Sequence, residues 1–232
     1  MQCRVNHPKC DGVGTITLDN GSLARCACAS IRKSEKQFLQ HGGNVRHLKF
    51  PSQLNQTATV NLSPTDSLRT VDSLKHYVKD LSRYIETRHK LFLAGHTGRG
   101  KSQYASTLML CALLRDYTAK FVDMRTLRLD MKGYKGTEQK EYLKSLAQAN
   151  VLVLDDLGVE RTDDFMRQEI MSALDYLIRH HSGLLVITMN NAARKDKLME
   201  YYENERFVDA LLEQPFTSVG FISENWREFD ER

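Results

Sequence analysis

The sequence predicts an open α/β fold in which helices cover both faces of a parallel sheet. Short apolar runs of strand length alternate with helix-length segments from residue 91 to residue 222, and this alternation is typical of parallel sheets. The run Val151–Leu154 is apolar at four consecutive positions, which indicates a strand buried on both faces. The chain of 232 residues, 41% of them hydrophobic, is long enough for one such core and a small additional module.

A glycine-rich segment between the first predicted strand of this sheet and the helix after it is the third observation. The strand Leu91–Ala94 precedes a GxxxxGKS pattern, and the predicted helix Ser102–Arg115 follows. The residues of the pattern are Gly95, His96, Thr97, Gly98, Arg99, Gly100, Lys101 and Ser102. Such a loop turns backbone N–H groups and a helix N-terminus toward phosphates. We expect it to bind ATP, with Lys101 at the β- and γ-phosphates and Ser102 on Mg²⁺.

Polar residues follow two further predicted strands, at the edge where parallel sheets place their ligands. Asp155 and Asp156 come directly after the apolar run, and Asn190 follows the strand Leu184–Thr188. We expect Asp155 to hold Mg²⁺ through water and Ser102. Asp156 is expected to orient or polarise the water that attacks the γ-phosphate. Asn190 is the candidate to hydrogen-bond that water or the γ-phosphate.

The remaining elements follow from periodicity and helix signals. Ser63 and Pro64 begin a helix that continues to about Arg88 with one apolar stripe. The other predicted elements are a strand at 119–123, helices at 137–150, 162–181, 192–203 and 204–213, and a fifth strand at 217–222.

Basic residues recur on one side of the short helix predicted after residue 123. Arg125, Arg128 and Lys132 stand at i, i+3 and i+7, with Lys135 just beyond. This edge is either a contact for a nucleic-acid backbone or a solvated helix face.

Four of the five cysteines lie in the first 28 residues, a clustering that favours metal over disulfides in a cytosolic protein. Thr15–Leu18 and the following Asp-Asn-Gly turn predict one half of a β-hairpin. A zinc ion needs four ligands, and it would be the main source of stability for so short a segment. The alternative is a disordered tail with incidental thiols. The expected ligands are His7, Cys10, Cys26 and Cys28, with Cys3 as the rival for the place of His7.

Charge and composition suggest a basic arm on a near-neutral body. Residues 1–60 hold eight Lys/Arg and three Asp/Glu, whereas the whole chain has a net charge of +4. Such an arm either contacts an acidic partner or nucleic acid, or is a soluble tail. No apolar run approaches 18 residues and no signal peptide is recognisable, so we expect a soluble cytoplasmic protein without a membrane partner. A basic helix from Ser30 is expected to end at Gly42-Gly43.

The phosphate loop, the Asp-Asp strand, Asn190 and the terminal Trp226-Arg227 together resemble the AAA+ ATPases of the DnaC/DnaI helicase-loader group. The resemblance covers residues 60–230, and the related IstB transposition ATPases share much of this body. The CxGxG pattern from Cys10 and the later CxC pattern also resemble the amino-terminal modules of DnaI-like and phage loaders.

This resemblance implies a three-layer P-loop AAA+ domain with a five-stranded parallel sheet in the order 5-1-4-3-2 and no substantial lid. It implies Asn190 as sensor 1 and Arg227 as sensor 2, which touches the γ-phosphate of the same subunit. We accordingly expect three parts: a zinc module with a basic helix for partner binding (1–47), a linker (48–62) and the ATPase domain (63–232).

Two residues depart from the family pattern. Loaders commonly carry ERxxxRLLE, in which the second arginine enters a neighbour's site, whereas residues 205–213 read ERFVDALLE. Ala210 occupies the expected position and only Arg206 remains, so hydrolysis is either slow or supported by Arg206. Arg99 stands where a small residue is usual, and it either adds charge near the phosphates or points to solvent.

The leading hypothesis is therefore a loader of a hexameric replicative helicase onto single-stranded DNA, in a bacterial cell or a phage-infected host. It would assemble with its own copies into a ring or spiral, and its ATPase would be weak and stimulated by partners. One alternative is an IstB-like transposition regulator that coats duplex DNA. The other is a nucleotide-gated adaptor that scarcely hydrolyses ATP.

Overall fold

The computed structural model describes residues 8–11, 14–44, 46, 76–158, 164–190 and 194–221, and for 164–167 the backbone alone. Several predicted features lie outside these residues: the ligand candidates Cys3 and His7, the linker 48–62, the first part of the helix from residue 63, and Arg227. Among the described helices, none is long and apolar enough to cross a membrane.

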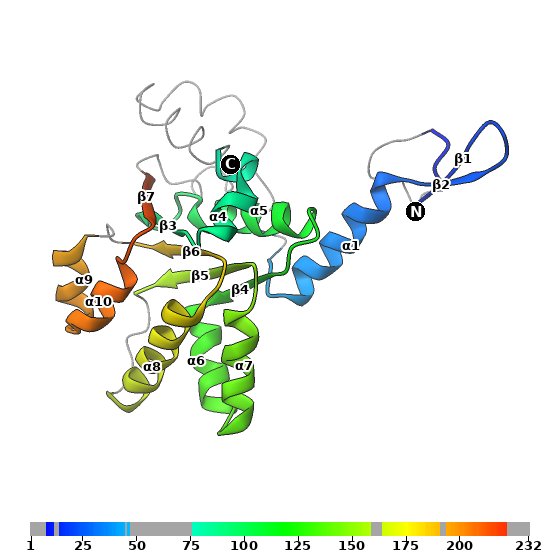
Figure 1. Cartoon of the computed structure of the whole chain (residues 1–232). Coiled ribbons are helices and arrows are strands. Elements are labelled where there is room, and N and C mark those ends of the chain that lie inside the picture. The colour runs from blue at the N-terminus through cyan, green and yellow to red at the C-terminus, as the bar shows by residue number, and fades with distance from the viewer. Residues whose placement is uncertain are drawn as a thin grey trace, which may run out of the picture.

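A five-stranded parallel sheet forms the middle layer of the molecule (Figure 1). Its strands are β3 (Lys90–Gly95), β4 (Ala119–Asp123), β5 (Val151–Leu157), β6 (Leu184–Met189) and β7 (Phe216–Phe221). Their spatial order is β4-β5-β6-β3-β7, and every neighbouring pair is parallel. Numbered along the chain this is 5-1-4-3-2, so the predicted sheet is confirmed. The strand that leads into the glycine-rich loop lies between β6 and β7.

Helices cover both faces of the sheet, because successive strand residues point to opposite sides. Leu91 and Leu93 of β3 belong to one core, and Phe92 and Ala94 belong to the other. Helices α4 (Leu81–Glu86) and α5 (Lys101–Leu113) pack on the first core. The second core is covered by α6 (Met124–Gly133), α7 (Thr137–Ala147), α8 (Asp164–His180), α9 (Lys195–Tyr202) and α10 (Glu205–Leu211). We call this three-layer unit the AAA+ body.

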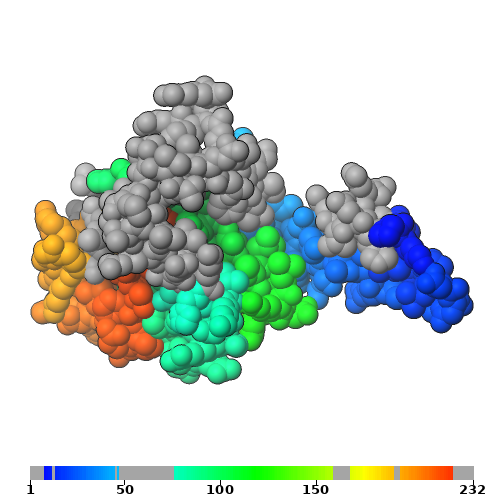
Figure 2. Space-filling view, turned by 90° about the horizontal axis from the view of Figure 1, so that it is seen from above, coloured from blue at the N-terminus to red at the C-terminus, as the bar shows by residue number. Residues whose placement is uncertain are grey.

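The amino-terminal module, described over residues 8–11 and 14–28, begins with the predicted hairpin. Strands β1 (Thr15–Thr17) and β2 (Leu23–Arg25) are antiparallel. The turn between them is closed by hydrogen bonds from the Leu18 N–H to the Ser22 carbonyl and from the Gly21 N–H to the Leu18 carbonyl, both 2.9 Å. The module lies apart from the AAA+ body, at the far end of α1 (Figures 1 and 2).

Helix α1 (Ala27–Gln40) joins the module to the AAA+ body. It begins three residues before the predicted start at Ser30, because the chain passes directly from β2 into the helix. Phe38 is 1% exposed and is part of the core under α5. The Ser34 hydroxyl donates to the Leu113 carbonyl (3.2 Å). After the helix, the His41 carbonyl accepts from the Phe121 N–H of β4 (2.8 Å). The carboxyl-terminal half of α1 therefore packs on the body.

Candidate functional site

The glycine-rich loop connects β3 to α5. Gly98 and Gly100 have φ angles of 79° and 83°, in the left-handed region that glycine adopts most readily. Gly100 is the N-cap residue of α5, so the loop turns directly into the first N–H groups of that helix. This is the strand–loop–helix setting in which such a pattern binds phosphate.

The ammonium group of Lys101 lies inside this loop. Its Nζ donates to the carbonyls of Gly95 (2.7 Å) and His96 (2.8 Å) and to Asn190 Oδ1 (3.1 Å). The Thr97 hydroxyl also donates to Asn190 Oδ1 (3.4 Å). Asn190 follows β6, the strand beside β3. The structure thus brings together the predicted phosphate lysine and the predicted asparagine, which lie far apart in the sequence.

The two predicted carboxylates lie at the end of β5, on the other side of β6. Asp155 is 5% exposed, and its Oδ1 accepts from the Thr188 hydroxyl (2.7 Å). Asp156 is half-buried, has a φ of 60°, and donates its N–H to the same hydroxyl oxygen (2.8 Å). The loop lysine, the asparagine and both carboxylates therefore lie at the carboxyl edge of three adjacent strands, where parallel sheets bind ligands.

Comparison with known proteins agrees with this geometry. Residues 37–216, most of the chain, match the family profile of IstB-like ATP-binding proteins. The chain belongs to this family. A relative from Pseudomonas fluorescens, a protein of insertion sequence IS1162 that is described as ATP-binding, is 30% identical over 93 residues. That match covers 40% of this chain and 40% of the relative's length.

Three solved structures share the fold of this IstB-like protein. The DnaC helicase loader has a TM-score of 0.53 at 20% identity, over 70% of this chain and 94% of that one. DnaI has a TM-score of 0.55 at 17% identity, over 77% and 94%. DnaA from Aquifex aeolicus, bound to AMPPCP, has a TM-score of 0.52 at 15% identity, over 72% and 50%. At these identities the likeness establishes the fold alone, which is that of AAA+ P-loop ATPases.

The two positions considered for the arginine that enters a neighbour's site, 206 and 210, lie on α10. Arg206 is exposed, and its carbonyl accepts from Arg179 Nη2 (3.3 Å). Ala210 is 6% exposed, and its carbonyl accepts from the buried Lys90 Nζ (2.7 Å). Burial lowers the pKa of Lys90, and the Glu213 carboxylate opposes this shift. The Ala210 side chain itself is buried, so an arginine at position 210 would have no room to extend toward solvent without moving its neighbours, whereas Arg206 already faces outward. It borders an open pocket lined also by Gln168, Met171, Ser172, Asp175, Asn204 and Phe207.

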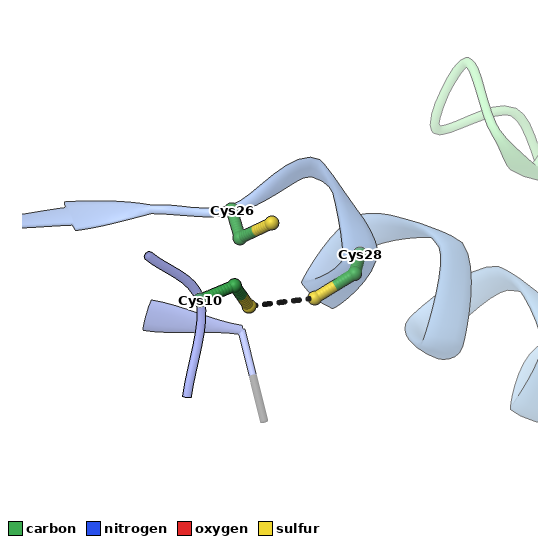
Figure 3. A group of neighbouring side chains, drawn as sticks. All are labelled: Cys10, Cys26 and Cys28. Atoms are coloured by element: carbon green, nitrogen blue, oxygen red, sulfur yellow. Dashed lines mark hydrogen bonds between the residues drawn. The ribbon is translucent and has the colours of Figure 1, made fainter. Parts of the chain in front are cut away.

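Three of the predicted metal ligands come together in the amino-terminal module (Figure 3). The sulfur atoms of Cys10, Cys26 and Cys28 all lie within 4.8 Å of one another, and those of Cys10 and Cys28 are 3.5 Å apart. In a tetrahedral site with Zn–S bonds of about 2.3 Å, two sulfurs are separated by about 3.8 Å. The spacing of the three thiols is compatible with a metal site, and both candidates for a fourth ligand, His7 and Cys3, lie outside the described residues.

Local structure holds these thiols in place. Cys26 is the N-cap residue of α1, and Cys28 lies in its first turn. Both side chains are buried. The Asp11 carboxylate accepts from the N–H groups of Gly14 (2.9 Å) and Thr15 (3.0 Å), which ties the neighbour of Cys10 to the start of β1.

Thr188 is the residue of this site that sequence reasoning missed. It ended a predicted strand without a role, although it is the only polar residue of β6. A hydroxyl at the carboxyl end of a buried strand that neighbours an Asp-Asp strand is the signal that could have identified it.

Proposed function

We propose that this IstB-like protein is an ATP-dependent loader of a hexameric replicative helicase onto single-stranded DNA. The observation that carries the proposal is an AAA+ body joined, in one chain, to a separate cysteine-rich module. The fold is similar over 94% of the DnaC helicase loader and of DnaI. The module stands away from the body on α1 (Figure 2), where it is available to a second protein.

The proposed chemistry is hydrolysis of the γ-phosphate of ATP. Lys101 binds the β- and γ-phosphates, and Asn190 orients the γ-phosphate or the attacking water. When bound, Mg²⁺ supplies charge that neutralises the phosphates, and Ser102 and Asp155 are the residues that would hold it. Asp156 orients the attacking water. Support comes from the shared sheet edge of these residues and from the contact between Lys101 and Asn190.

The amino-terminal module is proposed to hold zinc and to grip the helicase. Zinc suits a thiolate set of this kind, and His7 or Cys3 completes it in this proposal. Cys10, Cys26 and Cys28 supply three ligands. Leu23 and Leu18 on the hairpin are 72% and 43% exposed, and an exposed apolar pair of this kind suits a protein partner.

Helix α6 is the proposed contact for single-stranded DNA. Met124, Leu127 and Met131 are buried, which turns Arg125, Arg128 and Lys132 to solvent. Leu129 (62% exposed) and Tyr134 (40% exposed) lie among these cations. Cations beside an exposed aromatic ring are the combination that holds a phosphate backbone and stacks on bases.

Self-association into a ring or spiral is proposed to complete the active site. Arg206 faces outward on α10, and in this proposal it reaches the γ-phosphate bound by a neighbouring copy. A trans arginine raises hydrolysis by about 10³–10⁵-fold in other P-loop ATPases and GTPases. In a single copy we therefore expect slow turnover, which rises with helicase and DNA.

A transposition regulator is the second candidate, because the family profile and the IS1162 relative both point to that group. A regulator would form filaments on duplex DNA and would not bind the helicase. Mixing the purified protein with the host's replicative helicase, and separately with duplex and single-stranded DNA, distinguishes the two. Helicase binding that requires the amino-terminal module supports the loader, and ATP-dependent duplex filaments without helicase binding support the regulator.

A nucleotide-gated adaptor is the third candidate, and Ala210 is the observation that favours it. Turnover measured with helicase and single-stranded DNA present tests this reading. If turnover is robust and is lost in Arg206→Ala, the adaptor reading is wrong.

Two variants test the proposed ATPase site. Lys101→Ala should abolish ATP binding because the phosphates lose their ammonium group. Asp156→Asn should bind ATP but lose turnover by about 100-fold or more, since the attacking water loses its carboxylate. Binding of a fluorescent ATP analogue and phosphate release measure the two effects. Unchanged hydrolysis in either variant would contradict the site assignment.

The DNA surface is tested by removing its three cations. The triple variant carries Arg125→Gln, Arg128→Gln and Lys132→Gln. The slope of log affinity against log salt is negative, and its magnitude should decrease by about 2 in this variant, because about 0.7 counterions are released per phosphate of a single strand. The matched control removes three cations from the opposite layer, with Lys79→Gln, Arg83→Gln and Arg88→Gln. Equal salt slopes in both triple variants would show that α6 is not the contact for single-stranded DNA.

A further inference from the structure

The Thr188 side chain bridges the two carboxylate residues at the end of β5. It is fully buried, on the strand between β5 and β3. Its hydroxyl donates to Asp155 Oδ1 (2.7 Å) and accepts from the Asp156 N–H (2.8 Å). This one hydroxyl group therefore makes two hydrogen bonds, one as donor and one as acceptor, with two successive residues of β5.

The backbone at Asp156 depends on this contact. The register of β5 against β6 shifts between Leu154 and Leu157, so Asp156 lies outside the regular ladder of hydrogen bonds. Its φ of 60° is in the left-handed region, which is unfavourable for a residue other than glycine. The Thr188 hydroxyl accepts the N–H that the bulge takes out of the ladder, and so holds this conformation.

A packing role alone does not explain a threonine here. The other five residues of β6 are apolar and buried, and a valine would fill the same volume without a polar atom. A buried hydroxyl is unfavourable unless it is hydrogen-bonded. The two bonds to the carboxylate residues are what its polar group contributes.

We propose that Thr188 is a positioning residue for the reaction at this site. By holding Asp155 Oδ1 it fixes the plane of the carboxylate, and therefore the direction of Oδ2. By holding the Asp156 N–H it fixes the backbone from which the second carboxylate projects. Thr188 itself touches neither nucleotide nor metal in this inference, which rests on the proposed function.

Two substitutions separate the hydroxyl from the volume of the side chain. Thr188→Val keeps the β-branched shape and removes both hydrogen bonds, whereas Thr188→Ser keeps the hydroxyl. The control Thr217→Val makes the same change in β7, where the hydroxyl contacts His89 Nε2 (3.0 Å) at the other edge of the sheet. All three are compared with the full-length wild-type chain.

Thr188→Val should lower kcat by about 10–100-fold, the usual effect of losing a group that orients a metal ligand. The strengthening of ATP binding by Mg²⁺ should decrease in the same variant, while ATP affinity in EDTA stays unchanged. This binding measurement does not depend on turnover. Thr188→Ser and Thr217→Val should keep the wild-type response to Mg²⁺.

A wild-type kcat and a wild-type Mg²⁺ response in Thr188→Val would overturn the inference. If Lys101→Ala also binds and hydrolyses ATP normally, the proposed site itself is wrong; if Lys101→Ala is inactive, only the role of Thr188 fails. Should Thr188→Val not fold, as judged by circular dichroism, Thr188→Ala replaces it. An alanine variant that matches Thr188→Ser in both measurements would equally overturn the role.

Discussion

The amino-terminal module and the AAA+ body differ in what can hold them together. In the body, all six residues of β6 are buried, and helices cover the sheet on both faces. In the module, the two strands have three residues each and none of these six is buried. The buried side chains at its end are the thiols Cys26 and Cys28. The body has an extensive apolar core, whereas so small a module needs a further link, which the proposed metal would supply.

Helix α1 belongs to both regions. Its first turn carries a thiol of the cysteine cluster, and its last turns pack Phe38 under α5. Helix α1 therefore connects the cysteine cluster directly to α5, the helix that begins at Lys101. The following predictions test the contrast between the two regions, from the largest expected effect to the smallest.

The largest effect should come from removing one thiol of the cluster. We expect Cys26→Ser to lose bound zinc and to unfold the module, because three ligands and little apolar burial cannot hold it. The AAA+ body should keep its Tm and its ATP binding. Metal analysis, limited proteolysis of residues 8–25 and a thermal melt measure these outcomes.

Cys111→Ser is the matched control for this prediction. Cys111 lies on α5, away from the cluster, and burial raises the pKa of its thiol. This variant should keep its zinc and its proteolysis pattern. A Cys26→Ser chain that still holds stoichiometric zinc would show that the cluster is not the metal site.

The second prediction tests whether α1 is part of the core of the body, and its expected effect on stability is smaller. Phe38→Ala should lower the free energy of unfolding of the AAA+ body by about 3–5 kcal/mol, because a buried aromatic ring leaves a cavity. Zinc content should be unchanged. The neighbouring Leu39 is 53% exposed, so Leu39→Ala should change stability by less than about 0.5 kcal/mol. Urea unfolding of both variants measures the difference, and equal stabilities would place α1 outside the body's core.

The decrease in the stability of the body at low pH should come in part from His181. This side chain is 6% exposed, its Nδ1 lies 3.2 Å from the Ala147 carbonyl, and burial lowers its pKa to about 4. Among the described residues, its Nε2 has no hydrogen-bond partner. The unfolded chain takes up a proton near pH 6.5 and the folded chain only near pH 4. The contribution of neutral His181 to the free energy of unfolding is therefore fully present above pH 6.5 and is lost as the pH falls to 4.

This loss is on the order of 3 kcal/mol. Urea unfolding at several pH values between 7 and 4, in the wild type and in His181→Gln, measures it as the difference between the two slopes. Carboxylates contribute equally to both proteins and cancel in that difference. Parallel curves would show that His181 does not contribute to the acid sensitivity of the body.

Local patterns predicted most of the body. The apolar runs predicted the five strands to within three residues at each end, and the resemblance to loaders implied their order. The glycine-rich pattern also implied its strand–loop–helix setting. These features depend on neighbours in the sequence or on a pattern common to many chains. The predicted boundary at residue 47 grouped the basic helix with the module; the structure adds that Phe38 of α1 is buried in the core under α5, a contact that the charge pattern of the helix does not show.

The amino-acid sequence by itself determined the type of fold, the phosphate loop, the pair of carboxylates and the cysteine cluster, since each is written in adjacent residues or in their spacing. Only the tertiary structure decided that Thr188 joins Asp155 to Asp156, that Lys101 meets Asn190, and that Ala210 is buried while Arg206 is exposed. Each of these contacts joins segments on different strands or helices. These residues become neighbours only when the sheet and its helices assemble, so adjacent residues in the sequence do not show which side chains meet.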